Sequence, residues 1–226
     1  MDFGRGLSYI RRDPNWIVKV LLGSVISFVP ILNFAAIGYA LNTERNIYEG
    51  RETPLPEWGE NFGDYFVRGL FGVVIQFIYA LPAIAVACVY VALVVGAAAA
   101  TGDSSSSDSA GAGISMMMLC LYPLLFVVGL ACGIVGMVAQ ARYAISNNFS
   151  AALRFGEVFQ ELRQNFASWV LALVMMMIVG FGLGIVTLFT CGLGSLLSFY
   201  ATLAGVHWAA QAYHASNPSR LEPGTI

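Results

Sequence analysis

Four long apolar runs constrain this chain more than any other feature of its sequence. A helix that crosses the hydrocarbon core of a bilayer needs about 20 consecutive apolar residues, because each residue advances the helix by only about 1.5 Å. The runs that reach this length cover residues 69–100, 114–141, 167–189 and 193–213. We therefore predict an all-α membrane protein whose helices cross the bilayer several times.

The composition also favours a membrane protein. The chain of 226 residues is 58% hydrophobic and 11% charged, and its mean hydropathy is +0.73. A soluble domain carries roughly 25% charged residues, so a surface with so few charges suits lipid rather than water. We expect the lipid bilayer as a partner, and no nucleic acid.

A further apolar stretch, residues 16–41, allows two interpretations. Val29-Pro30-Ile31-Leu32-Asn33 interrupts it, and proline breaks the hydrogen-bond ladder of a helix. The stretch is thus either one kinked span or a short hairpin of two helices. The basic residues favour the hairpin, because Lys and Arg collect on the cytoplasmic side of membrane proteins. With six crossings all eleven Lys and Arg lie on one side, which places both termini in the cytoplasm.

Similar residues at the ends of the even-numbered helices indicate a threefold internal repeat. The fourth predicted helix ends in Ala139-Gln140-Ala141-Arg142-Tyr143-Ala144, and the sixth in Ala210-Gln211-Ala212-Tyr213-His214-Ala215. We predict a single membrane domain, residues 1–226, with repeat units at about 1–50, 51–148 and 149–216. A Gly- and Ser-rich stretch at 101–113 is expected to be a flexible linker, and residues 217–226 a short C-terminal tail.

Each odd-numbered helix follows a polar segment with apolar residues on one helical face. The aromatic residues concerned are Trp58, Phe62 and Phe66 before the third helix and Phe155, Phe159 and Phe166 before the fifth. Pro56 and Glu57 suit the first turn of the earlier segment. Amphipathic helices of this kind lie in the membrane interface, where they cover the bundle or dock on a membrane or partner. We therefore predict a bundle of six transmembrane helices in three hairpins, each preceded by a cytoplasmic interfacial amphipathic helix.

Two local motifs are the most specific in the chain. They are Leu55-Pro56-Glu57-Trp58 and the stretch from Pro30-Ile31-Leu32-Asn33 to Gly38-Tyr39. With Leu153-Arg154-Phe155-Gly156-Glu157-Val158 they resemble the bacterial and archaeal membrane family known as domain of unknown function 4013, over about residues 7–213. The resemblance implies a six-helix integral membrane protein without an assigned activity. The family is distantly similar to the membrane domains of some glycerophosphodiester phosphodiesterases, whose catalytic residues lie in a separate soluble domain, so no catalytic residue is implied.

Few polar side chains interrupt the apolar runs. The candidates for a polar cluster are Gln76, Gln140, His207 and Gln211. They either line a small cavity between the hairpins or form hydrogen bonds between helices. Lys19, near the inner end of the first helix, can extend its ammonium group to the interface. Close helix packing is expected at five small residues, namely Gly129, Gly133, Gly180, Gly182 and Gly184.

No combination of residues indicates a catalytic, cofactor or metal site. His207 and His214 are seven residues apart, about 10 Å along a helix axis, which is too far for both to bind one metal directly. Neither histidine has an acid nearby in the sequence. We therefore expect no enzymatic activity, no cofactor and no metal.

Two functions fit these features. The first is a non-catalytic scaffold or accessory subunit in the cell membrane, which would bind another membrane protein or a second copy of itself. The second is a channel, transporter or lipid-handling protein for a small apolar or lipid-like solute, which requires a cavity near the four polar residues. The acid-rich segment 44–64 is either a solvated surface or a docking site for a basic partner. We rank the scaffold first, because it needs only apolar helices, few buried charges and large interfacial helices.

Overall fold

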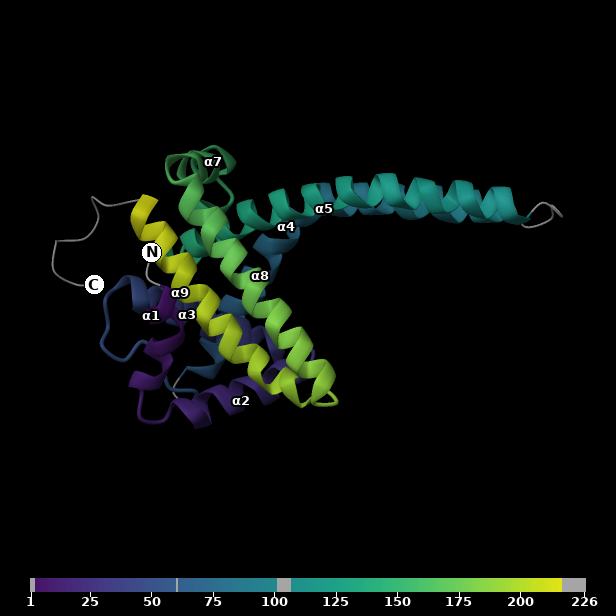
Figure 1. Ribbon diagram of the computed structural model, residues 1–226. Coiled ribbons are helices and arrows are strands. Elements are labelled where there is room, and N and C mark those ends of the chain that lie inside the picture. The colour runs from purple at the N-terminus through teal and green to yellow at the C-terminus, as the bar shows by residue number, and fades with distance from the viewer. Residues whose placement is uncertain (1–2, 60, 101–106, 217–226) are drawn as a thin grey trace. The chain divides into compact units, whose positions relative to one another are not determined.

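The computed structural model describes residues 3–59, 61–100 and 107–216, and the regular secondary structure in these ranges is entirely helical (Figure 1). The predicted all-α class is therefore confirmed. Three helices are long and apolar enough to cross a membrane, namely α4 (Phe62–Ala100), α5 (Ser107–Ser146) and α8 (Phe166–Phe189). The shorter elements are α1 (Phe3–Ser8), η1 (Tyr9–Arg12), α2 (Trp16–Phe28), α3 (Asn33–Tyr48), α6 (Phe149–Ala152), α7 (Phe155–Gln164), η2 (Leu193–Leu197) and α9 (Ser198–Ser216).

The chain divides into two compact units, and α4 and α5 contribute residues to both. The first unit contains Met1–Gln76 and Met137–Ile226, and the second contains Phe77–Gly136. In the second unit large apolar side chains such as Leu119 and Val127 are exposed. Exposed apolar area is unfavourable in water by about 25 cal/mol per Å², so this unit is suited to a lipid environment.

Helix α9 organises the core of the first unit. It packs most extensively against α3 and α8 and also contacts α1 and α2. Its residues Leu203, Trp208 and Tyr213 are almost fully buried. Most apolar residues of α9 therefore face protein, whereas Leu193 and Leu197 are exposed, and the run begins with the short helix η2 rather than with α9. Six transmembrane helices in three hairpins remain a prediction.

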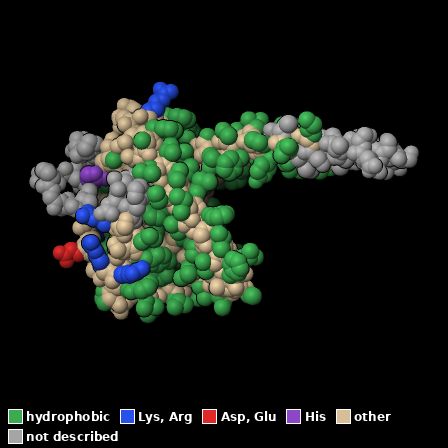
Figure 2. All heavy atoms as spheres, viewed as in Figure 1, with side chains coloured by type: hydrophobic (Ala, Val, Ile, Leu, Met, Phe, Trp, Pro, Cys, Tyr) green, Lys and Arg blue, Asp and Glu red, His purple; other side chains and the backbone are tan. Residues whose placement is uncertain are grey.

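Helix α8 presents the opposite pattern. Figure 2 shows hydrophobic side chains over much of the face that α8 presents. Phe181, Leu188 and Phe189 are among the most exposed apolar residues of the molecule. Only 6% of the most apolar window of α8 is buried inside the protein, so its surface has the character of a lipid-facing helix.

The break at Pro30 separates two helices. Helix α2 ends at Phe28, α3 begins at Asn33, and the two pack against each other. With 13 residues, α2 is about 20 Å long, whereas the hydrocarbon core is about 30 Å thick. The chain therefore folds residues 16–41 as two helices, and both α2 and the 16-residue α3 are too short for a full perpendicular crossing.

The helix predicted to start at Pro56 is wrong, because α4 begins at Phe62 and the segment before it is irregular. Four successive carbonyl oxygens in this segment accept hydrogen bonds from side chains instead of from a helical backbone. The pairs are Asn46 with Pro54, Lys19 with Leu55, Tyr39 with Pro56 and Tyr65 with Glu57. These bonds to side chains outside the segment hold it in an irregular conformation, which local sequence signals do not reveal.

Close helix packing occurs at glycines other than those predicted. A Cβ atom at Gly38 would overlap the carbonyl oxygen of Tyr65, and one at Gly69 would overlap that of Phe34. The backbones of α3 and α4 therefore touch at these two residues, as small residues permit. At all five predicted glycines, Gly129, Gly133, Gly180, Gly182 and Gly184, an added Cβ would meet nothing within 4 Å, so that prediction is wrong.

The predicted linker at 101–113 is only partly described. Residues 101–106 lie outside the described residues, and residues 107–113 form the first turns of α5. The flexible linker as a whole stays a prediction, and the predicted tail at 217–226 lies outside the described residues.

Candidate functional site

Lys19 is the centre of a buried ionic contact. Its Nζ lies 2.7 Å from Asp13 Oδ2 and 2.6 Å from Glu57 Oε1, and it donates a hydrogen bond to the Leu55 carbonyl oxygen. Lys19 and Asp13 are 5% and 3% exposed. The expectation that Lys19 extends to the interface is therefore wrong, because its ammonium group is buried and pairs with the buried Asp13 and the exposed Glu57. Removing one partner of such a buried pair costs about 3–5 kcal/mol.

The Leu55-Pro56-Glu57-Trp58 motif forms the outer wall of this contact. Leu55 is buried, Glu57 pairs with Lys19, and the Pro56 carbonyl accepts a hydrogen bond from the Tyr39 hydroxyl. The Trp58 ring stacks on Tyr39 with centroids 4.1 Å apart, and its Nε1 donates to the Lys19 carbonyl oxygen at 3.0 Å. Trp58 is 7% exposed, so its indole packs within the core instead of presenting a docking surface.

A polar hollow of about 580 Å³ surrounds this contact, and we call it the Lys19 hollow. Its charged lining residues are Asp13, Lys19, Arg45, Arg51 and Glu57. Glu49, just outside the lining, pairs with both arginines, through Arg45 Nε at 2.6 Å and Arg51 Nη2 at 2.8 Å. Burial acts against ionisation of Glu49, but hydrogen bonds from Arg45 and Arg51 bring its pKa below the usual value. Each cation of this hollow thus has a carboxylate partner.

A second hollow, of about 540 Å³, shares Asn42, Arg45 and Asn61 with the first, and we call it the Arg68 hollow. Its other lining residues are Asp64, Val67, Arg68, Phe71, Tyr143 and Asn147. Arg68 donates from Nε and Nη2 to Asn147 Oδ1 at 3.0 and 2.6 Å. Asn147 follows the end of α5 and has a left-handed backbone with φ of 52°. Asparagine tolerates this conformation better than most residues, and here it orients the guanidinium.

Three of the four residues of the predicted polar cluster, Gln140, His207 and Gln211, make helix-to-helix or local contacts. Gln140 of α5 donates from Nε2 to the Gly72 carbonyl oxygen of α4 at 3.1 Å, and Gln76 lies one turn further along α4. His207 stacks on Tyr9 with ring centroids 4.8 Å apart, and its Nδ1 lies 3.2 Å from Nε2 of Gln211 on the same helix. These contacts are the kind expected from polar groups that join helices. A single cavity lined by all four residues stays a prediction.

Glu44 is a buried acid that the sequence interpretation placed on a solvated, acid-rich surface. It is 2% exposed, and its Oε1 has no hydrogen-bond partner among the described residues. Burial raises the pKa of this carboxyl to about 8. The spacing Ala40-Glu44-Tyr48 would have revealed it, because residues four apart share one face of a helix and both neighbours are buried.

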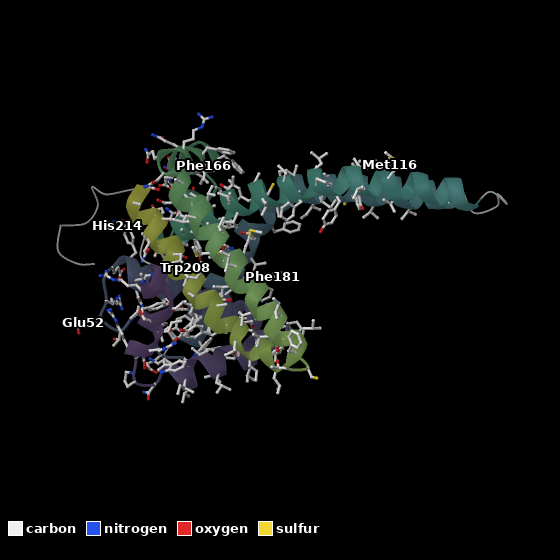
Figure 3. All side chains as sticks on the ribbon, viewed as in Figure 1. Glu52, Met116, Phe166, Phe181, Trp208 and His214 are labelled. Carbon is white, nitrogen blue, oxygen red and sulfur yellow. The ribbon has the colours of Figure 1, made fainter. Side chains whose placement is uncertain are left out.

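The predicted interfacial aromatics occupy two different environments. Phe155 and Phe159 of α7 and Phe166 of α8 are about half exposed, at 51%, 49% and 56%. Figure 3 shows Phe166 at the start of α8, Phe181 on the same helix, and Trp208 among the crowded side chains of the bundle. Helix α7 buries Val158 and Leu162 instead, and its Glu161 pairs with Arg142 of α5 at 2.9 Å.

Phe62 and Phe66, which were predicted to precede the third helix, belong to α4 itself. Phe62 is its first residue and is exposed, whereas Phe66 packs edge-on against Phe34 with centroids 5.7 Å apart. A docking role for the exposed phenylalanines stays a prediction. Within the described part of the chain, no group of three or more His, Cys, Asp or Glu side chains is placed to hold a metal ion.

Comparison with known proteins gives one match. A family model described as "Protein of unknown function (DUF4013)" matches residues 21–192, which is well over half of the chain and includes both specific motifs. No curated protein and no solved structure matches the chain.

Proposed function

The chain belongs to the DUF4013 family of proteins of unknown function, and from this premise we propose that it is a non-catalytic membrane scaffold or accessory subunit. The main support is the exposure of its three longest apolar helices. Only 6%, 17% and 6% of their most apolar windows are buried inside the protein. Apolar helices that bury so little of their own surface must be covered by lipid or by another membrane protein.

In the proposed topology the protein lies in the plasma membrane and has six membrane helices in three hairpins. Both termini lie in the cytoplasm. The packing of α2 on α3 and of α8 on α9 is compatible with two of these hairpins. The distribution of all eleven Lys and Arg on one side supports six crossings. In this topology the exposed phenylalanines of α7 lie in the cytoplasmic membrane interface.

The interior of the first unit favours a scaffold over a channel. Its largest fully buried side chains are Trp169, Trp208, Tyr39, Tyr65 and Tyr213. Large aromatic rings that fill a bundle leave no room for a water-filled path of the kind a polar solute needs. The Lys19 and Arg68 hollows are lined by residues at helix ends and loops, not along the length of the bundle.

A lipid-handling protein is the alternative, and one observation favours it. The Arg68 hollow combines two arginines with the exposed apolar residues Val67 and Phe71. Charged and apolar groups in one hollow match the two chemical parts of a lipid molecule. The alternative would make lipid a substrate or cargo, whereas the scaffold needs lipid only as its surroundings.

Extraction of the protein with its surrounding membrane in a detergent-free polymer, followed by mass spectrometry, tests the proposal. The scaffold predicts one protein partner, or a second copy, in constant ratio to the chain. A matched variant, Phe155→Ser with Phe159→Ser, should reduce that ratio if α7 is the docking element, while Phe181→Ser on α8 should not. Recovery of one enriched lipid and no protein partner would replace the scaffold with the lipid-handling alternative.

A further inference from the structure

The Arg68 hollow lies where two apolar helices meet the membrane boundary. Its α4 residues, Asp64 to Phe71, stand at the start of one candidate span, and Tyr143 and Asn147 stand at the end of another. Both helix ends belong to the same compact unit. Such a position corresponds to the level of lipid headgroups, where phosphate is the commonest anion.

The positive charge of this hollow is only partly neutralised. Arg45 Nε forms an ion pair with Glu49 Oε1. Within the described ranges Arg68 makes no ion pair, and its hydrogen bonds go to the neutral amide oxygen of Asn147. Asp64 is the single carboxylate in the lining. Because Arg45 and Arg51 share Glu49, the three arginines Arg45, Arg51 and Arg68 face only two carboxylates, Glu49 and Asp64, and one net positive charge remains.

Asn147 holds Arg68 ready for a ligand. The amide oxygen accepts hydrogen bonds from Nε and Nη2 of Arg68, and Nη1 has no hydrogen bond in the described part of the chain. A non-glycine residue in the left-handed region costs free energy, and such residues concentrate at ligand clamps. The asparagine backbone bonds to the Tyr143 carbonyl oxygen at 2.9 Å, so the end of α5 fixes the position of the amide.

Apolar side chains complete the hollow on one side. Val67 and Phe71 are 50% and 39% exposed. Phe71 also contacts Phe149 and Tyr143, with ring centroids 5.2 and 6.3 Å apart. An arginine pair beside an exposed apolar wall suits a molecule with an anionic head and an acyl chain better than it suits a fully hydrated ion.

The Lys19 hollow does not share this property. There Asp13 and Glu57 already lie within 2.7 Å of the ammonium group, and Arg51 pairs with Glu49. An additional anion would meet carboxylates on several sides. The two hollows therefore differ in available charge although they share three residues.

We propose that the Arg68 hollow binds the phosphate group of an anionic lipid, with Arg45 and Arg68 as its ligands and Val67 and Phe71 against the acyl chain. Arginine binds phosphate oxygens through paired N–H donors. The same phosphate chemistry is offered by a lipid headgroup and by free phosphate, so the two sources must be separated by experiment. The proposal goes beyond the scaffold function and requires only that the hollow lies at the membrane surface.

Binding of three probes to the full-length protein in dodecyl maltoside micelles tests this site. The probes are dioctanoyl-phosphatidylglycerol, dioctanoylglycerol, which lacks the phosphate, and inorganic phosphate. Microscale thermophoresis should show saturable binding of the phosphatidylglycerol, at least about tenfold tighter than that of either other probe, because charge and apolar contact add. Equal affinity for inorganic phosphate would show that the hollow binds phosphate, and it would contradict a lipid headgroup as the source of that phosphate.

Variants assign the binding to this hollow. Arg68→Gln should weaken phosphatidylglycerol binding by about tenfold or more, since it removes a charge-assisted contact. Asn147→Gly keeps the backbone conformation but removes the amide oxygen, and should also weaken binding. Asp64→Asn removes the opposing carboxylate and should tighten it. Arg163→Gln, which removes an exposed charge of α7, is the matched control and should change nothing.

Some results would overturn the proposal. One is the absence of saturable phosphatidylglycerol and phosphate binding by the wild-type protein. Another is equal binding by the wild type, Arg68→Gln and Asp64→Asn, since opposite charge changes must act in opposite directions at a phosphate site. Asp64→Asn predicts a gain, so a general loss of folding cannot imitate the expected pattern.

Discussion

The Lys19 hollow and the Arg68 hollow contain the same kinds of side chain but use them differently. Lys19 is enclosed by Asp13 and Glu57 and is almost inaccessible. Arg68 faces an open hollow and is held by a neutral amide. A cation whose charge is matched inside the protein stabilises the fold, whereas a cation that is oriented but unmatched can bind an anion from outside. The difference lies in the partners and not in the basic residues themselves.

The largest effect should come from breaking the matched contact. Lys19→Ala leaves the buried Asp13 without a counter-charge and should lower the free energy of unfolding by about 3–5 kcal/mol. Chemical denaturation in detergent micelles measures this change. The double variant Lys19→Met with Asp13→Asn should recover much of the loss, because it removes both buried charges together. A single variant as stable as the wild type would show that the contact is not part of the folded core.

The contact between α3 and α4 gives the next largest effect, because it brings the arginine-bearing segments together. An added methyl group at Gly38 would overlap the Tyr65 carbonyl oxygen. Gly38→Ala should therefore destabilise the protein by about 1–3 kcal/mol, and it should also weaken phosphatidylglycerol binding at Arg68. Gly180→Ala, where the methyl group meets open space, serves as the control in the same denaturation experiment. Equal effects of the two variants would contradict the close approach.

Glu44 extends the comparison to a buried carboxyl group with no hydrogen-bond partner at Oε1 in the described part of the chain. Its pKa is raised from 4.5 to about 8, so the folded state holds the proton more tightly than the unfolded state. Stability from this group is fully present below about pH 4.5 and is lost as the pH rises towards and through 8. Glu44→Gln should remove this dependence and stabilise the protein by about 1–3 kcal/mol at pH 9. Melting temperatures from pH 5 to pH 9 measure it, and parallel curves for both proteins would contradict the burial of an unpartnered acid.

The smallest expected effect distinguishes the Arg68 hollow most clearly from its neighbour. Arg68→Gln should change the free energy of unfolding by no more than about 0.5 kcal/mol, because the side chain serves an open hollow. The same substitution should have its large effect on phosphatidylglycerol binding. Chemical denaturation of Arg68→Gln and Lys19→Ala under the same conditions compares the two losses of unfolding free energy. Equal losses would show that Arg68 stabilises the fold as Lys19 does.

The helices of this protein were easier to predict than their contacts. The long apolar runs predicted α4, α5 and α8, and Pro30 predicted the break between α2 and α3. These features depend on hydropathy and on a backbone donor that proline lacks, and both are local properties of the sequence.

The contacts depend on residues that are distant in the sequence. The helix expected at Pro56 is absent because side chains from Lys19, Tyr39, Asn46 and Tyr65 bind the carbonyl oxygens of that segment. His207 finds its ring partner in Tyr9, near the other end of the chain. The pattern of glycines within one helix likewise does not reveal which helix will approach it.

The Arg68 hollow shows the same limit for the site. Arg45, Arg68 and Asn147 each look like ordinary surface residues in the sequence. Only the approach of α3 to α4 and the left-handed turn after α5 bring them together. Glu44 could have been recognised earlier, because its spacing to Ala40 and Tyr48 places it on the buried face.

Labelling of single cysteines in intact cells tests the proposed membrane topology most directly. In a variant with the other cysteines replaced by Ala, the exposed Cys191 between α8 and α9 should react with a membrane-impermeant maleimide from outside the cell. Gln160→Cys on α7 should react only after the membrane is permeabilised, because the proposed topology places α7 on the cytoplasmic side with the basic residues. Reaction of both positions from the same side would contradict the topology and, with it, the membrane scaffold.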